Sequence, residues 1–291
     1  EDARPTDLDG RTENLLWQTL WGTWAPDSDD PMTADRLTAY LIKASREQKG
    51  WTTWSAPDID REQGLTDYAT HLLTDPDTAN ELNAFAALTA KDVSSIILAN
   101  KAMALTWLGV ADIYQGSELT RTSLVDPDNR RAVDYDGEGG LRAMLSQVSA
   151  GSSPRTLDQE KLRLTHRLAQ LRAERPDTFV GPRSGYRAVP VTTSHAFAYA
   201  RLLDEEPDVV VIVRRLGRRL RRLGGWREEC VVLPDGQWTE VLTEESVDGG
   251  AQRLADVVGD LPVVVLARDR QAGRADTRED RAEREAGGGT A

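Results

Sequence analysis

The sequence predicts a mixed fold of the α/β plus all-β class: a helical first part, one strand with a long polar loop, and an antiparallel β-domain. Three observations support this. Apolar residues recur at helical spacing from Thr12 to Leu108, a short apolar run at residues 110–114 precedes a cluster of charges, and beyond Gly185 the pattern becomes that of strands. The 291 residues are enough for two ordinary domains with real cores.

At least four helices are expected in the first part. Dipeptides that favour loops separate them at Asp30-Pro31, Pro57-Asp58 and Asp75-Pro76, and Thr33 is a plausible N-cap for the second helix. Apolar positions with helical spacing are Leu16, Leu20, Trp24, Leu37, Tyr40, Leu41, Ala44, Tyr68, Leu72, Leu82, Phe85 and Leu88. Trp17, Trp21 and Trp24 share this spacing, so we expect them in the core.

The centre of the chain has the order of a βα unit. Residues 93–107 are predicted to form a helix, and Val110–Tyr114 a short buried strand followed by a polar loop. Thr156 and Gln159 form a possible capping box for a later helix, which Pro176 ends.

About five strands are expected from residue 183 to 268, in a small antiparallel sandwich or barrel. They are the segments HAFAYAR, DVVVIVR, ECVVL, GQWTEVL and LPVVVLA, and a tight turn at Leu233–Gly236 is expected to join the third and fourth. The tail at 269–291 has no large apolar residue, so we expect it to be disordered.

Composition excludes several classes of function. The net charge of −12 opposes general binding to nucleic acid or to anionic membranes, and no run of 18 uncharged apolar residues suggests a membrane span. A single cysteine, Cys230, cannot form an internal disulfide, which favours a cytoplasmic location. The three histidines lie in separate predicted elements, and the chain has no nucleotide-binding or hydrolase motif, so we expect no metal and no cofactor.

A cluster of arginines interrupts the β-domain. Two interpretations stay open for it: a contact for an anion or RNA, or a solvated loop that neutralises acidic surface, which the lack of interleaved aromatic residues favours. Its members are Arg214, Arg215, Arg218, Arg219, Arg221 and Arg222.

The polar loop at residues 109–136, GVADIYQGSELTRTSLVDPDNRRAVDYD, is the richest candidate site. Its carboxylates, amide and guanidinium groups suit a polyhydroxylated ligand, and a loop after a parallel strand is where such folds bind ligands. From the residues alone, Asp128 with Arg130 or Arg131 could equally be a structural salt bridge. Trp51 and Trp54 follow Gly50 at a helix end, where their rings could form a sugar-binding platform or simply pack.

These segments resemble a known family. GVADIYQGSEL and SLVDPDNRRAVDYD are similar to the block around the last barrel strand of the maltooligosyltrehalose synthases, in the α-amylase superfamily (glycoside hydrolase family 13). TENLLWQTLWGTW and RLTAYLIKASREQKGWTTW resemble its helical insertion, and GYRAVPV, GGWREECVVLPDGQWTEVLT and LPVVVLAR its C-terminal sheet domain. The resemblance covers residues 12–268, with Leu108, Ala111 and Ala132 where the family usually has proline.

The resemblance implies the C-terminal portion of a synthase. The expected domains are a helical insertion of a (β/α)8 barrel at 1–92, the last barrel βα unit with its loop and connecting helix at 93–182, and a β-sandwich at 183–268. The family rearranges the reducing-end α-1,4 linkage of a maltooligosaccharide to α,α-1,1 by retaining intramolecular transglycosylation, in trehalose biosynthesis.

The same resemblance assigns roles to residues of this chain. The family's three catalytic carboxylates are expected before Glu1, so no catalytic residue is assigned, the chain alone is expected to be inactive, and the missing N-terminal part of the enzyme is its expected partner. The expected substrate-binding residues are Tyr114, Gln115, Glu118, Asp126, Asp128, Asn129, Arg130, Arg131, Lys49 and Trp54. The alternatives are a non-catalytic maltooligosaccharide-binding or scaffold protein and another α-amylase-type glucanotransferase.

Overall fold

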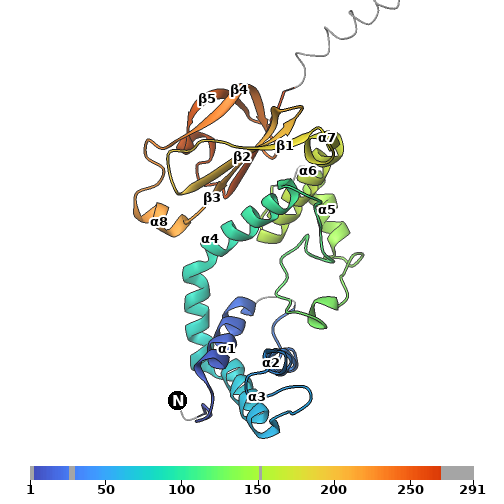
Figure 1. Cartoon of the computed structure of the whole chain (residues 1–291), viewed down its shortest axis with the longest axis vertical. Helices are drawn as coiled ribbons and strands as arrows, with labels where there is room; N and C mark the ends of the chain where they lie inside the picture. The colour runs from blue at the N-terminus through green and yellow to red at the C-terminus, as the bar shows by residue number, and fades with distance from the viewer. Residues whose placement is uncertain (1–2, 26–29, 151–152, 270–291) are drawn as a thin grey trace, which may run out of the picture. The chain divides into compact units, whose positions relative to one another are not determined.

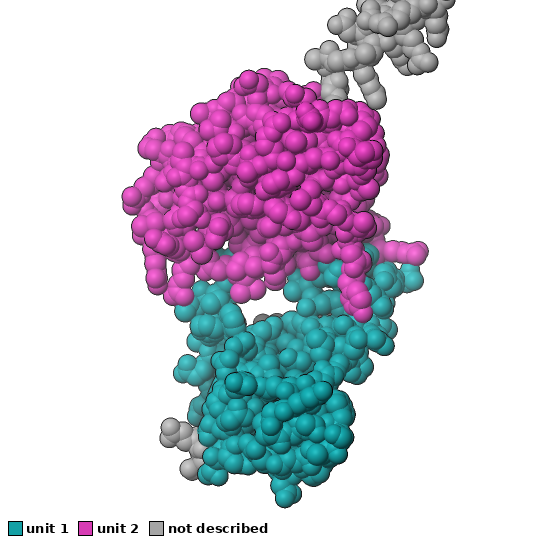
Figure 2. All heavy atoms as spheres, viewed as in Figure 1, with its two compact units in different colours: residues 1–91, 115–141 teal, residues 92–114, 142–291 magenta. Residues whose placement is uncertain are grey.

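A computed structural model describes residues 3–25, 30–150 and 153–269. The chain divides into two compact units (Figures 1 and 2): unit 1 holds residues 1–91 and 115–141, and unit 2 holds 92–114 and 142–291. Thus residues 115–136 of the polar loop cluster with the helices of the first part, and the connecting helix clusters with the β-domain. The predicted disorder at 270–291 lies outside the described residues.

Four helices form the first part of the chain, as the spacing predicts. They are α1 (Gly10–Thr23), α2 (Ala34–Gln48), α3 (Ile59–Thr74) and α4 (Pro76–Thr106). The side chains of Asp9, Thr33 and Asp58 cap the first three by accepting hydrogen bonds from backbone N–H groups of the first turn. The predicted N-cap at Thr33 is therefore confirmed.

The core of unit 1 gathers leucines from α1, α2 and α3, with Leu82 from α4 and Leu124 from the polar loop packed against it. The prediction that the tryptophans of α1 lie in this core is wrong for two of them. Trp17 is 37% exposed and Trp21 is 40% exposed, whereas Trp24 is half-buried and its Nε1 donates to Asn83 Oδ1 at 2.8 Å. The apolar stripe of α1 is too broad to be buried completely, and the smaller leucines take the inner face.

Helix α4 is 31 residues long and contributes to both units. Among the described residues it is the one helix whose length and composition would allow it to cross a membrane, and less than a quarter of its apolar window is buried. Core helices of soluble proteins can also meet such a criterion. The expectation that the chain has no membrane partner stays a prediction.

The sequence predicts a buried strand at Val110–Tyr114, and no strand forms there within the described part of this chain. The segment has no regular secondary structure and pairs with no strand in the part of the chain that the structure describes, and Val110 is 90% exposed. Ala111 and Ile113 pack against the core of unit 2, so the alternation of a strand is present without the hydrogen-bonded neighbours. A strand needs such partners to satisfy its backbone, and sequence pattern alone does not supply them.

The connecting region holds α5 (Leu141–Ser149), α6 (Leu157–Glu174) and the single turn α7 (Pro176–Phe179). The cap of α6 is close to the predicted capping box. Thr156 Oγ1 accepts from the Gln159 N–H at 3.2 Å, but the Gln159 side chain accepts from Arg155 N at 2.7 Å and not from the cap residue itself. Helix α6 ends before Pro176, as predicted.

The β-domain is one antiparallel sheet of six strands in the order β1-β2-β3-β6-β4-β5. The strands are β1 (Ser184–Ala188), β2 (Ala196–Leu203), β3 (Glu206–Arg214), β4 (Cys230–Glu240), β5 (Ser246–Arg253) and β6 (Val263–Arg268), with short helices α8 (Gly217–Arg222) and α9 (Leu254–Val257). Described strands therefore pair within one sheet, where the sequence suggested a sandwich or a barrel. The arginine cluster falls on the end of β3 and on α8.

Alternation along the central strands supplies two hydrophobic cores, one on each face of the sheet. Val209, Val211 and Val213 of β3 face a core shared with α4, α6 and α7, whereas Val210 and Ile212 face a core with the buried Trp238 of β4. Burial on both faces explains why β3 and β6 are continuous apolar runs.

The tight turn expected at Leu233–Gly236 is also wrong. Strand β4 runs through these residues, and its register against β5 shifts between Leu233 and Gln237. Gly236 has φ of +125°, a conformation that side chains rarely adopt, and this allows the strand to bulge instead of reversing. The polar strand β5 and the short β1 were not among the predicted segments.

Candidate functional site

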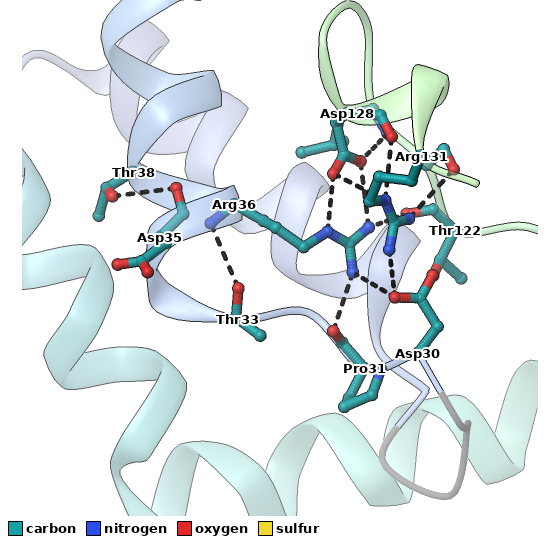
Figure 3. Close-up of polar contacts among 11 residues, drawn as sticks. Asp30, Pro31, Thr33, Asp35, Arg36, Thr38, Thr122, Asp128 and Arg131 are labelled. Atoms are coloured by element: carbon teal, nitrogen blue, oxygen red, sulfur yellow. Dashed lines mark hydrogen bonds and ion pairs between the residues drawn. The ribbon is translucent and has the colours of Figure 1, made fainter.

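The polar loop is organised around the carboxylate of Asp128, which lies in a one-turn 3-10 helix, η1 (Asp128–Arg130). Arg36 of α2 binds both carboxylate oxygens, with Nε–Oδ1 at 2.8 Å and Nη2–Oδ2 at 3.0 Å (Figure 3). The backbone N–H of Leu124 donates to Oδ2 at 2.7 Å. Asp128 is thus held by three donors from two distant parts of unit 1, and its side chain is 9% exposed.

Arg36 and Arg131 extend this network to neighbouring backbone and to the entry of α2. Arg36 donates to Pro31 O at 2.8 Å and to Thr122 O at 3.1 Å, while Arg131 Nε donates to Asp128 O at 2.9 Å (Figure 3). Arg131 also pairs with Asp30. The loop is therefore tied to α2 by charge-assisted hydrogen bonds.

Helix α2 fixes the loop at a second point. Lys43 Nζ donates to Asp126 O at 2.6 Å. Arg36 and Lys43 are seven positions apart, which is two helical turns, so both project from one side of the helix. Asp126 also pairs with Arg130 at 2.9 Å, in a contact more exposed than that of Asp128.

The charges of the network keep both aspartates ionised. Burial acts to raise the pKa of the Asp128 carboxyl, but hydrogen bonds from Arg36 and Leu124 and the positive charges of Arg36 and Arg131 hold this pKa below its usual value. For Asp126, the hydrogen bond from Arg130 lowers the pKa. A general acid needs a raised pKa to keep its proton, so neither carboxyl is arranged for that role.

Other predicted site residues line the same loop. Glu118 Oε2 and Asn129 Oδ1 are buried oxygen atoms with no hydrogen-bond partner among the described residues. Gly116, at φ of +77°, lies where an added Cβ would meet Arg121 Nη1 at 2.3 Å and Val133 Cγ2 at 2.9 Å, so the loop needs glycine there. The loop therefore offers acceptors that its own folding does not use.

Lys49 and Trp54 lie at and beyond the C-terminal end of α2. Lys49 caps the helix with a left-handed backbone, φ 58° and ψ 31°. Trp54 is 59% exposed, and the guanidinium of Arg46 lies 5.0 Å from its ring centroid. Arg46 is fixed in turn by Glu62, with Nε–Oε1 at 2.8 Å and Nη2–Oε2 at 2.6 Å, and Glu62 also accepts from Thr52.

The structure thus assigns the predicted residues different environments. Asp128 and Arg131 are committed to the network, and Arg130 to Asp126, whereas Trp54 is exposed. Tyr114 is the last residue of the part of the polar loop that belongs to unit 2. Of the two readings of Asp128, the salt bridge is observed with Arg131 at 3.3 Å, and sugar contact stays a prediction.

Sequence reasoning did not find the two residues of α2 that hold the loop, Arg36 and Lys43. Their signal was weak but present, because Arg36 and Lys43 have the spacing that puts two cations on one side of a helix. The pattern does not say which of several acidic residues such cations meet.

Comparisons with known proteins find maltooligosyltrehalose synthases among the relatives of this chain. Over 266 residues, 90% of this chain, it is 36% identical to a protein of Mycobacterium tuberculosis named as a maltooligosyl trehalose synthase. Among solved structures, maltooligosyltrehalose synthase from Arthrobacter ramosus matches 88% of the chain with a TM-score of 0.75 and 29% identity. A maltooligosyl trehalose synthase of Sulfolobus tokodaii matches 90% with a TM-score of 0.66 and 26% identity.

The chain belongs to the maltooligosyltrehalose synthase family. It spans about a third of its relatives' length, 32% of the M. tuberculosis protein and 32% of the A. ramosus chain. This share is consistent with the C-terminal portion that the loop and sheet-domain motifs indicate. No family model matches the chain.

Proposed function

We propose that the chain is the C-terminal portion of a maltooligosyltrehalose synthase and forms one wall of its glucan cleft. The whole enzyme would convert the reducing-end α-1,4 linkage of a maltooligosaccharide to an α,α-1,1 linkage. The observation that carries the proposal is the ordered match along 90% of the chain, at 36% identity, to a relative named for this activity.

In such a reaction a carboxylate attacks the anomeric carbon, and a carboxylic acid protonates the departing oxygen of the terminal glucose. The acid, now a base, then takes a proton from the anomeric hydroxyl of that glucose as it attacks the glycosyl-enzyme. The released glucose must turn over without leaving the cleft. The cleft must exclude water from the glycosyl-enzyme during this time. We assign this enclosure, and not the covalent chemistry, to the present chain.

Two features support the assignment of sugar enclosure, and not of covalent chemistry, to this chain. Asp126 and Asp128 are held ionised by arginines, so they bind and position but do not donate protons. The Arg36–Asp128–Arg131 network holds the loop in one conformation before any ligand arrives, which lowers the entropy lost on binding. The chain alone should therefore bind sugar without turning it over.

We assign sugar contacts first to groups that the fold leaves accessible or without a partner: Trp54, Glu118, Asn129 and the exposed Tyr114 and Gln115. An indole matches the C–H face of a pyranose, and the free oxygens accept from its hydroxyls. Lys49, Asp126 and Arg130 complete the rim, and Asp128 and Arg131 contact sugar only through groups not used in the network.

In the whole enzyme, the segment Val110–Tyr114 is proposed to form the last strand of a (β/α)8 barrel. Its alternation supports this, because Ala111 and Ile113 pack on the core of unit 2 while Val110 is exposed. No backbone hydrogen bond joins residues 110–114 to any other described residue, so both edges are available to neighbouring strands. Those strands would come from the remainder of the synthase.

Reconstitution tests the proposal. The chain is co-expressed with the N-terminal two thirds of a related synthase, or fused to it, and incubated with maltopentaose. Trehalose-ended oligosaccharide, detected as product without a reducing end, is expected from the mixture and from neither part alone. A folded complex without any product would count against the synthase, and a different linkage in the product would indicate another glucanotransferase. Sugar binding without product would favour the non-catalytic binding protein.

A further inference from the structure

A groove in unit 1 lies between α1 and the first turns of α4, and its described lining contains none of the residues assigned to the loop site. It has a volume of about 830 Å³, within the range of small-ligand sites. Its lining includes Trp17, Gln18, Trp21, Asn80, Glu81 and Phe85. We call it the aromatic groove.

Three aromatic side chains expose their surface to this groove. Trp17 and Trp21 are one turn apart on α1, so their indoles follow each other along one side of the helix. Phe85, 45% exposed, packs edge-on against Trp21 with ring centroids 5.0 Å apart. This contact fixes the ring of Trp21, so the platform exists before a ligand binds.

Three polar side chains of the same lining point into solvent-accessible space. The side chains of Gln18, Asn80 and Glu81 are exposed and make no hydrogen bond to any residue that the structure describes. Two amides and a carboxylate together offer both donors and acceptors. Such groups interspersed with flat apolar rings match a molecule with alternating hydroxyls and C–H faces.

The charge of the groove lining restricts the class of ligand that can bind. Among the described residues, the lining includes Asp75, Asp77 and Glu81 but neither lysine nor arginine, so it repels phosphorylated and other anionic ligands. A neutral polyol is compatible, since carboxylates accept hydrogen bonds from hydroxyls. The relatives are named for a maltooligosaccharide. Such a sugar is a neutral chain of repeating units, each with hydroxyls and C–H faces.

We propose that the aromatic groove is a second maltooligosaccharide-binding site, separate from the loop of residues 115–131. The inference rests on the proposed function, because that function supplies the class of sugar. A glucan held in the groove would raise the effective concentration of its other end, and this would favour longer chains over short ones.

Calorimetric titration of the full chain with maltoheptaose tests the site. Trp17→Ala/Trp21→Ala should weaken this binding about tenfold, as expected when about 1.4 kcal/mol of stacking is lost, and Trp54→Ala should leave the groove component of the titration unchanged. Asn80→Arg, at an exposed position, should block the groove without touching the core. Circular dichroism shows whether each variant is folded, and the affinity for this neutral sugar should not change with salt.

Three results would overturn the site: no binding by the folded unmodified chain, binding abolished by Trp54→Ala alone, or unchanged binding in Asn80→Arg. If Trp17→Ala/Trp21→Ala binds sugar normally but no longer associates with the N-terminal part, the groove is a protein interface. Reconstituted activity on the short maltopentaose should survive the groove variants. The test of the groove and the test of the proposed function can therefore fail independently of each other.

Discussion

Arg36 and Asp128 are 92 positions apart in the chain and meet through two parallel hydrogen bonds, Nε–Oδ1 at 2.8 Å and Nη2–Oδ2 at 3.0 Å. Their side chains are 12% and 9% exposed. A planar guanidinium against a carboxylate fixes orientation as well as distance, so this pair sets the position of the loop on α2. Removing one partner would leave the other charge nearly buried and uncompensated.

Asp128→Asn should therefore lower the free energy of unfolding of unit 1 by about 3 kcal/mol, measured by urea denaturation. Asp126→Asn is the matched control, because the Asp126–Arg130 pair is 45% and 69% exposed and should contribute less than about 1 kcal/mol. Arg36→Met with Asp128→Leu should recover part of the loss. Equal effects of the two Asn variants would show that burial of the pair does not matter.

Acidification should weaken unit 1 through the same carboxylates. Hydrogen bonds from Arg46 hold the pKa of Glu62 below its usual value, and the Asp128 pKa is also depressed. A carboxyl whose pKa is lower in the folded than in the unfolded protein contributes its full stabilisation above the unfolded pKa of about 4. This stabilisation is lost as the pH falls through the lower pKa of the folded state. The urea midpoint should therefore decrease below about pH 5. Glu62→Gln should be less stable at neutral pH and show a shallower decrease, and a parallel profile would contradict the assignment.

The sequence predicted those helices and strands that are determined by nearby residues in the chain. The helix at Ala34–Gln48 follows from its period and from Thr33, and β3 and β6 follow from runs of valine that need burial on both faces. In β5 the sequence SVDGGAQR has neither signal, and it is a strand because β4 lies beside it. Pairing partners override local preference there.

The candidate site was predictable in composition but not in partners. The loop's carboxylates and arginines are visible in the sequence, and so is the helix that holds them. Which arginine meets Asp128 depends on how α2 and the loop pack, and Arg36 lies closer in space than its position in the chain suggests. The exposure of Trp17 and Trp21 likewise depends on how many neighbours α1 has, which the period of 3.6 does not encode.

Val110 and Ile113 offer a matched test of the proposed barrel strand. Val110→Asp should change the stability of the chain alone by less than about 0.5 kcal/mol, because the side chain is 90% exposed. Ile113→Asp should cost about 2 kcal/mol or more, because Ile113 packs against the core of unit 2. When the N-terminal part of a synthase is supplied, Val110→Asp should reduce co-purification and activity. Normal assembly of this variant would argue that the segment is a surface loop.

Gly249 of β5 should be intolerant of a side chain because it lies opposite the bulge in β4. A Cβ there would come within 2.6 Å of Pro234 O and 2.8 Å of Asp235 Cα, and both are backbone atoms that cannot turn aside. Gly249→Ala should therefore lower the thermal midpoint of unit 2, with a loss of about 2 kcal/mol. Gly64→Ala is the control: within α3, its Cβ would make an ordinary contact at 3.6 Å with Pro5, so it should stabilise unit 1 by up to about 1 kcal/mol. Since the clash exists only if β4 bulges, a tolerated Gly249→Ala would mean that residues 233–236 turn, as the sequence alone suggests.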